Sequence, residues 1–468
     1  MAKKRKVASR TRRAAPSPDT AAAGFELPPL PPGGDTPGVE TTGRFIVVMK
    51  EAGRAQPARV RQTLNDVAGM KNIAAASDFE SGAVSSAHLA SDAATYFERL
   101  GIVVVSDEDA VQALAAEAAD ADSQILVIEP EYVAYPTGLV LPEESGEYIR
   151  GYRDGINSLY DQLAKAPGEA AADVEARLTS FRDTDQFTWG IQAVGAHTSR
   201  FTGQGIKLAV LDTGFDLAHP DFRGRAVVTQ TFSGVPVQDT HGHGTHCIGT
   251  ACGPLRPPTG VRRYGVATAV QIFAGRIFDD AARPRAATSA VIAGIEWAIT
   301  NGCRIVSLSI GVPINQKIEQ YDVPTRRALN AGTLIVAAAG NNAQRPGNPG
   351  FVEPPANADA TLAVGAIDRR KQIAEFSGRS SLVTGVGGRV NIAAPGVAVF
   401  SSFPVARGRH ALLDGTSMAT PHVAGVAALW AEATGESGVA LWNRVIQSAA
   451  ALTLPSADVG SGLVQAPQ

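Results

Sequence analysis

The second half of the chain alternates short, almost continuously apolar segments with stretches of helical spacing. Strands are expected at 206–214, 270–278, 303–311, 333–341 and 361–368, and helices at 286–302 and 321–332. Strands that lack polar alternation are buried on both faces, and strands separated by helices run parallel. The pattern therefore predicts an α/β fold with a doubly wound, mostly parallel sheet in a three-layer arrangement.

The preceding region has a different pattern. Short strands are expected at 43–50 and 98–107, a strand pair at 123–136, and helices at 58–69 and 107–120. This alternation is typical of a small α+β domain of the split βαβ, ferredoxin-like kind. Residues 138–186 are charged and helical in propensity, so we expect a helical connector between the two domains.

The N-terminal arm, residues 1–43, is predicted to be disordered because it is first basic and then rich in proline. Its start, MAKKRKVASRTRR, is not followed by the apolar core of a signal peptide. The chain also lacks the run of about 18 apolar residues that predicts a membrane span. We therefore expect a cytoplasmic protein with no membrane partner, with secretion left open. The arm is either a solubilising tail or a nuclear-type address or anionic-surface contact.

Net charge and cysteine content further limit the class of protein to which the chain can belong. A net charge of −3 argues against nucleic acid as the main partner. Three cysteines, Cys247, Cys252 and Cys303, are too few for a disulfide framework. This usage fits a reducing compartment.

Residues able to carry chemistry fall where the expected strands end. Asp212 lies at the end of the strand at 206–214, and Asn341 ends the strand at 333–341. Ligands of such sheets bind at the carboxyl ends of the strands. Each residue also has an ordinary explanation, an aspartate that caps a turn and an asparagine in an Asx turn.

Three histidines, His241, His243 and His246, follow one another in DTHGHGTHC. Their spacing is compatible with a metal site. The glycine and threonine residues between them favour a tight entry into a helix instead, so no metal site is expected here.

Ser417 stands among small residues at the start of an apolar helical stretch, GTSMATPHVAG. Backbone N–H groups at a helix N-terminus are unpaired, and the helix dipole favours developing negative charge there. An attacking hydroxyl and an oxyanion would share this place, and small neighbours would let a substrate carbonyl approach the backbone. A serine that only caps the helix needs none of these neighbours.

Together these stretches carry a family resemblance. LDTGFDLAHPDF, HGTHCIGT, SLSIG, AAAGN, NIAAPGV and GTSMATPHVAG follow one another within residues 187–455. This set resembles the subtilisin-like serine proteases (subtilases, peptidase family S8), and Cys247 matches the proteinase K branch. The resemblance implies a serine endopeptidase that hydrolyses polypeptides, with a catalytic domain at 187–455 and a short tail at 456–468.

The resemblance also implies roles for single residues. Ser417 would be the nucleophile, and Asp212 would orient the base and stabilise its cation. His243 would be the general base because HGTH aligns as a block, which leaves His246 structural. Asn341 and the Ser417 backbone N–H would hold the oxyanion.

Two walls of the substrate cleft follow from the same resemblance. One wall would pair with the substrate backbone, which binds as an added strand. Both walls would flank the S1 pocket. This pocket receives the side chain of P1, the substrate residue on the acyl side of the cut bond. The expected wall residues are Ser309, Ile310 and Gly311 on one side, and Ala338, Ala339 and Gly340 on the other.

Glu353 falls at the base of the S1 pocket when residues are counted back without gaps from AVGA at 363–366. The family often has a small residue there. An acid in this pocket would favour Lys or Arg at P1. The alternative is a glutamate turned into solvent on a loop.

A departure from the family concerns calcium. Asp221 matches a family calcium ligand, but the loop that usually supplies the other ligands is GPLRPPTGVRRYG, with Arg256, Arg262 and Arg263 and no acid or amide. We therefore expect this site to be lost and no cofactor to be required, with calcium elsewhere left open.

The domain at 44–137 resembles the inhibitor-I9-like propeptides, through RFIVVMK at its start and ILVIEPEYVAYP at its end. The resemblance implies a zymogen whose propeptide templates folding and places its tail in the active site as an intramolecular inhibitor. Pro136 disfavours a cut after Tyr135. Cleavage is expected at about 137–141, in the connector, or not at all.

Two other functions stay open. One is a regulated intracellular protease that acts on a single partner protein, with the arm and the connector as docking elements. The other is a catalytically silent scaffold, against which the intact set of Asp212, His243, Asn341 and Ser417 weighs.

Overall fold

The structure is a computed structural model, and it describes residues 39–51, 57–89, 91, 94–137, 180–279, 282–381 and 388–468. Most of the expected arm at 1–43 and of the expected connector at 138–186 lies outside the described residues. The body described below runs from Val39 to Gln468.

A parallel sheet of seven strands forms the centre of the larger part of this body, in the order β14-β13-β12-β10-β6-β8-β7. Its strands are β6 (Lys207–Asp212), β7 (Val227–Thr231), β8 (Gln271–Arg276), β10 (Ile305–Leu308), β12 (Leu334–Ala338), β13 (Thr361–Ile367) and β14 (Ile392–Pro395). Five of them match expected strands. The edge strand β7 and the short β14 were not expected, because β7 is only half-buried and β14 ends in a proline.

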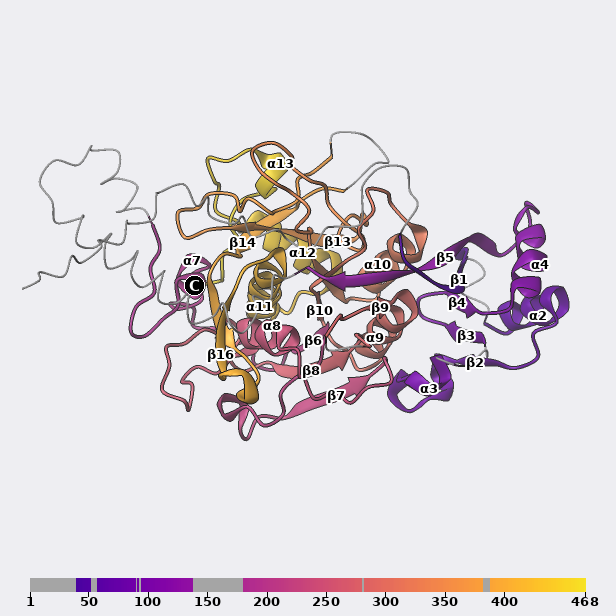
Figure 1. Cartoon of the computed structure of the whole chain (residues 1–468), viewed down its shortest axis with the longest axis horizontal. Helices are drawn as coiled ribbons and strands as arrows, with labels where there is room; N and C mark the ends of the chain where they lie inside the picture. The colour runs from indigo at the N-terminus through magenta and orange to yellow at the C-terminus, as the bar shows by residue number, and fades with distance from the viewer. Residues whose placement is uncertain are drawn as a thin grey trace, which may run out of the picture. The chain divides into compact units, whose positions relative to one another are not determined.

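Helices cover both faces of this sheet (Figure 1). On one face lie α8 (His243–Cys252) and α11 (Thr416–Thr434), and on the other lie α9 (Thr288–Thr300) and α10 (Glu319–Asn330). Alternate residues of each strand point to the two layers, which is why the strands read as unbroken apolar runs. The expected three-layer α/β fold is confirmed.

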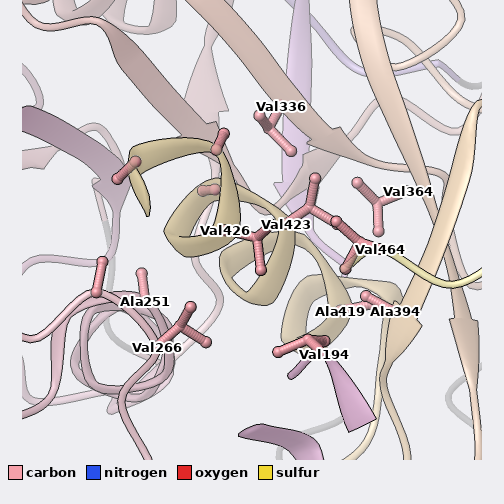
Figure 2. Packing of buried hydrophobic residues seen from close by; sticks show 14 of the residues in the cluster. Val194, Ala251, Val266, Val336, Val364, Ala394, Ala419, Val423, Val426 and Val464 are labelled. Carbon is pink, nitrogen blue, oxygen red and sulfur yellow. The ribbon is translucent and has the colours of Figure 1, made fainter. Parts of the chain in front are cut away.

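The helix α11 crosses the middle of its face because its residues are small. Val423 and Val426 pack among side chains from the sheet and neighbouring segments, including Val336, Val364 and Val464 (Figure 2). A Cβ added to Gly425 would lie 2.7 Å from the Cβ of Val266, so only glycine allows this close approach. Burial of each such valine contributes about 1.5–2 kcal/mol, and this packing fixes the N-terminus of α11 against the sheet.

The smaller part of the body is the expected α+β domain. Its strands are β1 (Thr41–Met49), β2 (Ile73–Ala75), β3 (Ala94–Phe97), β4 (Ile102–Val105) and β5 (Ile125–Pro136), in the order β5-β1-β4-β3-β2. The helices α2 (Pro57–Ala68) and α4 (Glu108–Ala118) cover one face through a core that includes Val47, Leu64 and Leu114. The expected strand pair at 123–136 is wrong, because β5 is one long strand.

The other face of this sheet packs on the larger part. Ile46, Val48 and Ile102 belong to the same buried cluster as Ala290 and Ile295 of α9. One buried cluster therefore extends across the two domains.

The C-terminal segment, expected as a separate tail at 456–468, packs on the larger part of the body. It contains the short helix α13 (Ser456–Val459), and Val464 is fully buried. The Val464 N–H donates to the Ala393 carbonyl at 3.0 Å, beside β14. At the other end, the Phe181 N–H donates to the Arg369 carbonyl at 2.9 Å, so residues just before 187 also pack here.

No helix in the described part of the chain is both long and apolar enough to cross a membrane.

Candidate active site

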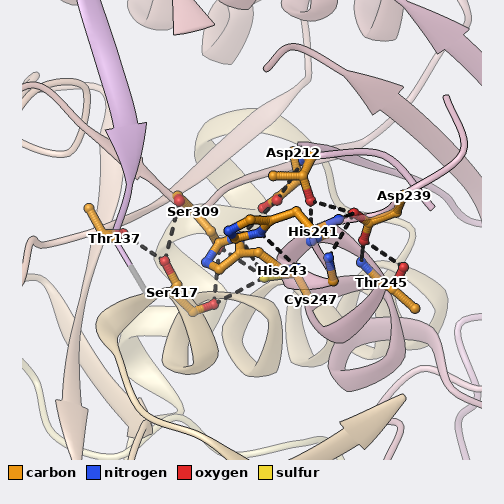
Figure 3. Close-up of polar contacts among 12 residues, drawn as sticks. Thr137, Asp212, Asp239, His241, His243, Thr245, Cys247, Ser309 and Ser417 are labelled. Carbon is orange, nitrogen blue, oxygen red and sulfur yellow. Dashed lines mark hydrogen bonds and ion pairs between the residues drawn. The ribbon is translucent and has the colours of Figure 1, made fainter. Parts of the chain in front are cut away.

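The expected site residues meet at the carboxyl edge of the parallel sheet. Asp212 is the last residue of β6, His243 is the first residue of α8, and Ser417 is the second residue of α11. Asn341 follows β12 by three residues. Figure 3 shows Asp212, His243 and Ser417 gathered in one region, although they come from distant parts of the chain.

Asp212 and His243 form a buried pair. His243 Nδ1 donates to Asp212 Oδ1 at 2.7 Å, and the Thr213 N–H donates to the same oxygen at 2.7 Å. Burial by itself lowers the pKa of His243, but the Asp212 carboxylate and Cys247 together raise the pKa well above the usual value. His243 Nε2 is buried and has no hydrogen-bond partner in the described structure.

A second aspartate, which the sequence did not point to, holds the start of α8. Asp239 accepts hydrogen bonds from the Gly242 N–H at 2.8 Å and the Thr245 N–H at 2.9 Å, and from the hydroxyl of Thr213 at 3.1 Å (Figure 3). Carboxylates stabilise a helix N-terminus by accepting its unpaired N–H groups. Asp239 thereby ties the helix that carries His243 to the strand that carries Asp212.

The other two histidines of the run have different surroundings. His246 Nε2 bonds the Val399 carbonyl at 2.9 Å, and burial lowers the pKa of His246 to about 3. Burial also lowers the pKa of His241 to about 4. Two groups of three potential metal ligands occur among the described residues, with their ligand atoms within 4.8 Å of one another. They are Asp212–His243–Cys247 and His219–Asp221–His410. The three histidines of the run do not form such a trio.

The hydroxyl of Ser417 faces residue Thr137, the last residue described before the connector. Ser417 Oγ lies 2.7 Å from Thr137 Oγ1 and donates to the Ser309 carbonyl at 3.2 Å (Figure 3). Cys247 lies beneath, with Sγ 3.5 Å from the Ser417 carbonyl oxygen. Cys247, Cys252 and Cys303 are all buried free thiols.

Two donors converge on one carbonyl oxygen. Asn341 Nδ2 and the Ser417 N–H, the latter at 3.4 Å, both donate to the Thr137 carbonyl. The Asn341 amide is itself oriented, because its Oδ1 accepts from the Thr416 N–H at 3.0 Å and from the Thr416 hydroxyl at 2.9 Å. The end of the smaller domain thus places a peptide carbonyl between the residues expected to hold an oxyanion.

The chain that leads to this carbonyl runs as an added strand. The last part of β5 pairs antiparallel with β11 (Ile310–Gly311) on one side and with β9 (Ala286–Ala287) on the other. The Thr137 N–H also donates to the Ser309 carbonyl at 3.2 Å. The expected wall at 309–311 therefore contacts this strand, whereas β9 was not expected because two alanines carry no strand signal.

The second expected wall, Ala338, Ala339 and Gly340, is buried at the end of β12. The Glu353 N–H donates to the Ala339 carbonyl at 3.1 Å, which places the backbone of Glu353 beside this wall. Glu353 is only 5% exposed, so the alternative of a glutamate turned into solvent is wrong. Its Oε1 accepts from Asn342 Nδ2 at 2.8 Å, and burial raises the pKa of Glu353 to about 7.

Protein donors surround Asp221, the residue that matches a calcium ligand. Its Oδ1 accepts from the N–H and the hydroxyl of Thr259, at 3.0 and 2.7 Å. Its Oδ2 accepts from the Tyr264 hydroxyl at 2.8 Å and from His410 Nε2 at 2.9 Å. Calcium requires six to eight oxygen ligands. At Asp221 both carboxylate oxygens already accept two protein hydrogen bonds each.

The site defines a class of enzyme. A buried aspartate–histidine pair, a serine at a helix N-terminus and two donors on a carbonyl oxygen are the parts needed for acyl transfer through a serine nucleophile. The class is thus that of the serine hydrolases.

Comparison with known proteins specifies the class. The Subtilase family profile matches residues 203–463. The chain is 36% identical over 310 residues to an alkaline protease of Shouchella clausii, covering 65% of this chain and 75% of that protein. It is 38% identical over 282 residues to subtilisin BL of Lederbergia lenta (59% and 96%), and 33% identical over 363 residues to a thermostable alkaline protease of Halalkalibacterium halodurans (75% and 93%). The chain belongs to the subtilase family and is a subtilisin-like serine endopeptidase.

Proposed function

We propose that this endopeptidase is made as a zymogen, that Asp212, His243 and Ser417 are its catalytic triad, and that its own β5 tail is its first substrate and its inhibitor. The observation that carries the proposal is the position of the Thr137 carbonyl, which accepts hydrogen bonds from Asn341 Nδ2 and the Ser417 N–H. The proposed cut lies between Thr137 and Gly138.

The chemistry follows from these positions. Ser417 turns its hydroxyl from the Ser309 carbonyl toward His243 Nε2, which takes the proton as Oγ bonds the carbonyl carbon. Asn341 and the Ser417 N–H hold the resulting oxyanion. The carbon–nitrogen bond then breaks, and His243 returns the proton to the leaving amine. Water hydrolyses the remaining ester in the same way, and Asp212 stabilises the imidazolium in both stages.

The added-strand arrangement accounts for binding. Main-chain pairing on β9 and β11 fixes an extended peptide in register, whatever its sequence. This positioning converts attack on the carbonyl into a step between groups already in contact. Polypeptides in general are therefore the proposed substrates.

Docking of the smaller domain supports the inhibitor role. The helices α9 and α10 have no side-chain caps of their own. Glu129 accepts from the N–H groups of Glu319 and Gln320 at 3.0 and 2.8 Å, and Glu131 accepts from the Ser289 N–H at 2.7 Å. Each such cap contributes about 1 kcal/mol. Two carboxylates of β5 thus cap both helices and hold the tail in the cleft.

Intact mass over time tests the proposal, with wild type compared with Ser417→Ala. We expect wild type, and not the variant, to yield a fragment whose N-terminal sequence starts GLVLP. If neither chain is cut but wild type alone reacts with a fluorophosphonate, the enzyme is competent and held shut, and the single-partner protease becomes the better description. If wild type neither cuts itself nor reacts, the proposal fails in favour of the scaffold.

A further proposal concerns cofactors. We propose that the enzyme needs no calcium at Asp221, because Thr259, Tyr264 and His410 supply the contacts that an ion would otherwise make.

A further inference from the structure

We infer that Glu353 makes the S1 pocket select a cation, so that the enzyme cleaves after Lys or Arg in preference to large apolar residues. The inference rests on the proposed function, because it takes Thr137 as the P1 residue of a bound peptide. It concerns the substrate class that this particular cleft accepts.

The direction of the Thr137 side chain locates the pocket. A Cβ added to Gly311 would lie 2.8 Å from Thr137 Cγ2 and 1.9 Å from Glu353 Oε2. The P1 side chain and the carboxylate therefore both approach the position that a side chain on Gly311 would occupy. On the opposite wall, a Cβ added to Gly340 would lie 2.9 Å from Glu353 Cδ. The carboxylate thus lies between the two walls, in the space that a P1 side chain longer than threonine would enter.

Among the residues that the structure describes, the Glu353 carboxylate has no charged partner. It is 5% exposed, and the Asn342 amide is its hydrogen-bond partner among the described residues. Burial and this one hydrogen bond account for the shift in its pKa, with no contribution from a neighbouring charge. A buried carboxylate is costly unless it is paired.

The charge state of the P1 side chain therefore decides how well it fits. An apolar P1 side chain would remove the remaining water from the carboxylate and leave it unpaired. The ammonium of Lys or the guanidinium of Arg would pair with it.

The native tail does not meet this preference. Threonine carries no positive charge to pair with Glu353, and its hydroxyl lies 2.7 Å from Ser417 Oγ. Threonine at this position therefore makes the tail a slow substrate that occupies the cleft. Replacement of Thr137 changes P1 in the full-length chain and needs no separate peptide.

The test compares self-cleavage of Thr137→Lys with that of Thr137→Met, an uncharged side chain of similar length, each in the wild-type and Glu353→Gln backgrounds. Intact mass gives the rate of cleavage after residue 137. With Glu353 present, we expect the Lys chain to be cut roughly 10- to 100-fold faster than the Met chain. In the Glu353→Gln background, we expect the ratio to fall to about one or below, since the amide carries no charge.

A second measurement uses pH. Proton uptake by Glu353 removes its charge, so the Lys-to-Met ratio should rise as pH increases through about 7 and stay flat in the Glu353→Gln chains. The titration of His243 affects both chains equally and cancels in the ratio.

Three outcomes overturn the inference. They are equal rates for Lys and Met, a faster Met chain, or an unchanged ratio in Glu353→Gln. Absence of any Ser417-dependent cleavage in all four chains is a different result, because it overturns the proposed function itself. A Thr137 chain that is cut faster than Thr137→Lys would assign a small-residue preference to the pocket instead.

Discussion

At the scale of single residues, the site depends on side chains that hold other side chains. Thr416 fixes the Asn341 amide through two hydrogen bonds, and Asp239 fixes the start of α8. Neither touches the Thr137 carbonyl. Their contribution is orientation, since an oxyanion donor is effective only when it points to where the charge develops.

Replacement of Asn341 by leucine removes one of the two proposed oxyanion donors. We expect kcat to fall about 10²- to 10³-fold with little change in KM, because the lost hydrogen bond strengthens in the transition state. Steady-state kinetics on a peptide substrate measures this. Asn443→Leu, on the exposed side of α12 (Gly438–Gln447), is the matched control and should be neutral. A change confined to KM would count against the oxyanion role.

At the scale of elements, α9 carries an unusual buried acid under the smaller domain. Glu296 is 2% exposed, and the Arg99 N–H donates to its Oε1 at 3.2 Å. Burial raises the pKa of Glu296 to about 7, and the nearby charge of Glu98 adds to this rise. The backbone hydrogen bonds from Arg99 and Leu100 and the positive charge of Arg99 oppose it. Undocking of the smaller domain would expose this carboxyl and return its pKa toward 4.5.

Docking of the smaller domain should therefore weaken as pH rises. Glu296 binds its proton more tightly in the docked state than in the undocked state. This difference stabilises docking fully below the pKa of the undocked carboxyl, and the stabilisation is lost between about pH 4.5 and 7. The free energy of docking should change by on the order of 3 kcal/mol across this pH range. Hydrogen-exchange protection of the β1 and β4 amides in Ser417→Ala, corrected for intrinsic rates, measures it.

Glu296→Gln supplies the comparison for this prediction, since an amide of the same shape does not titrate. The fall in protection should be clearly smaller in that chain, whereas Glu108→Gln on the exposed side of α4 should behave as the parent. An equal fall in all three chains would assign the pH dependence to other groups.

At the scale of the whole molecule, Asp221 joins segments that are far apart in the sequence. Thr259 and Tyr264 come from the loop after α8, and His410 begins β16 (His410–Leu413), which pairs with β15 (Val399–Ser402). Links between distant segments stabilise the folded chain against local opening. Here hydrogen bonds from Thr259, Tyr264 and His410 to one carboxylate make these links.

We therefore expect excess EDTA to leave the thermal midpoint of wild type unchanged. Tyr264→Phe should instead lower stability by about 1–3 kcal/mol, with or without EDTA, because it removes a donor from a buried carboxylate. Thermal unfolding followed by circular dichroism measures both. A midpoint that calcium raises in wild type and not in Asp221→Asn would contradict the proposal.

The sequence by itself determined the layers of the fold and the residues that meet at the sheet edge. Helical and strand periodicities are local, so 206–214 and 333–341 could be recognised without knowledge of their neighbours. Because the carboxyl ends of parallel strands share one edge, Asp212 and Asn341 were expected at that edge, and the structure places Asp212 at the end of β6 and Asn341 just after β12. Their roles remain predictions for kinetics to test.

Only the tertiary structure decided the register of the tail and the partners of the charged residues. The expected strand at 303–311 divides into β10, which joins the parallel sheet, and β11, which pairs with β5. The capping of α9 and α10 by Glu131 and Glu129 was likewise absent from the local pattern. The contacts of β5 join segments more than a hundred residues apart, and their energies depend on burial and geometry that no short window of sequence contains.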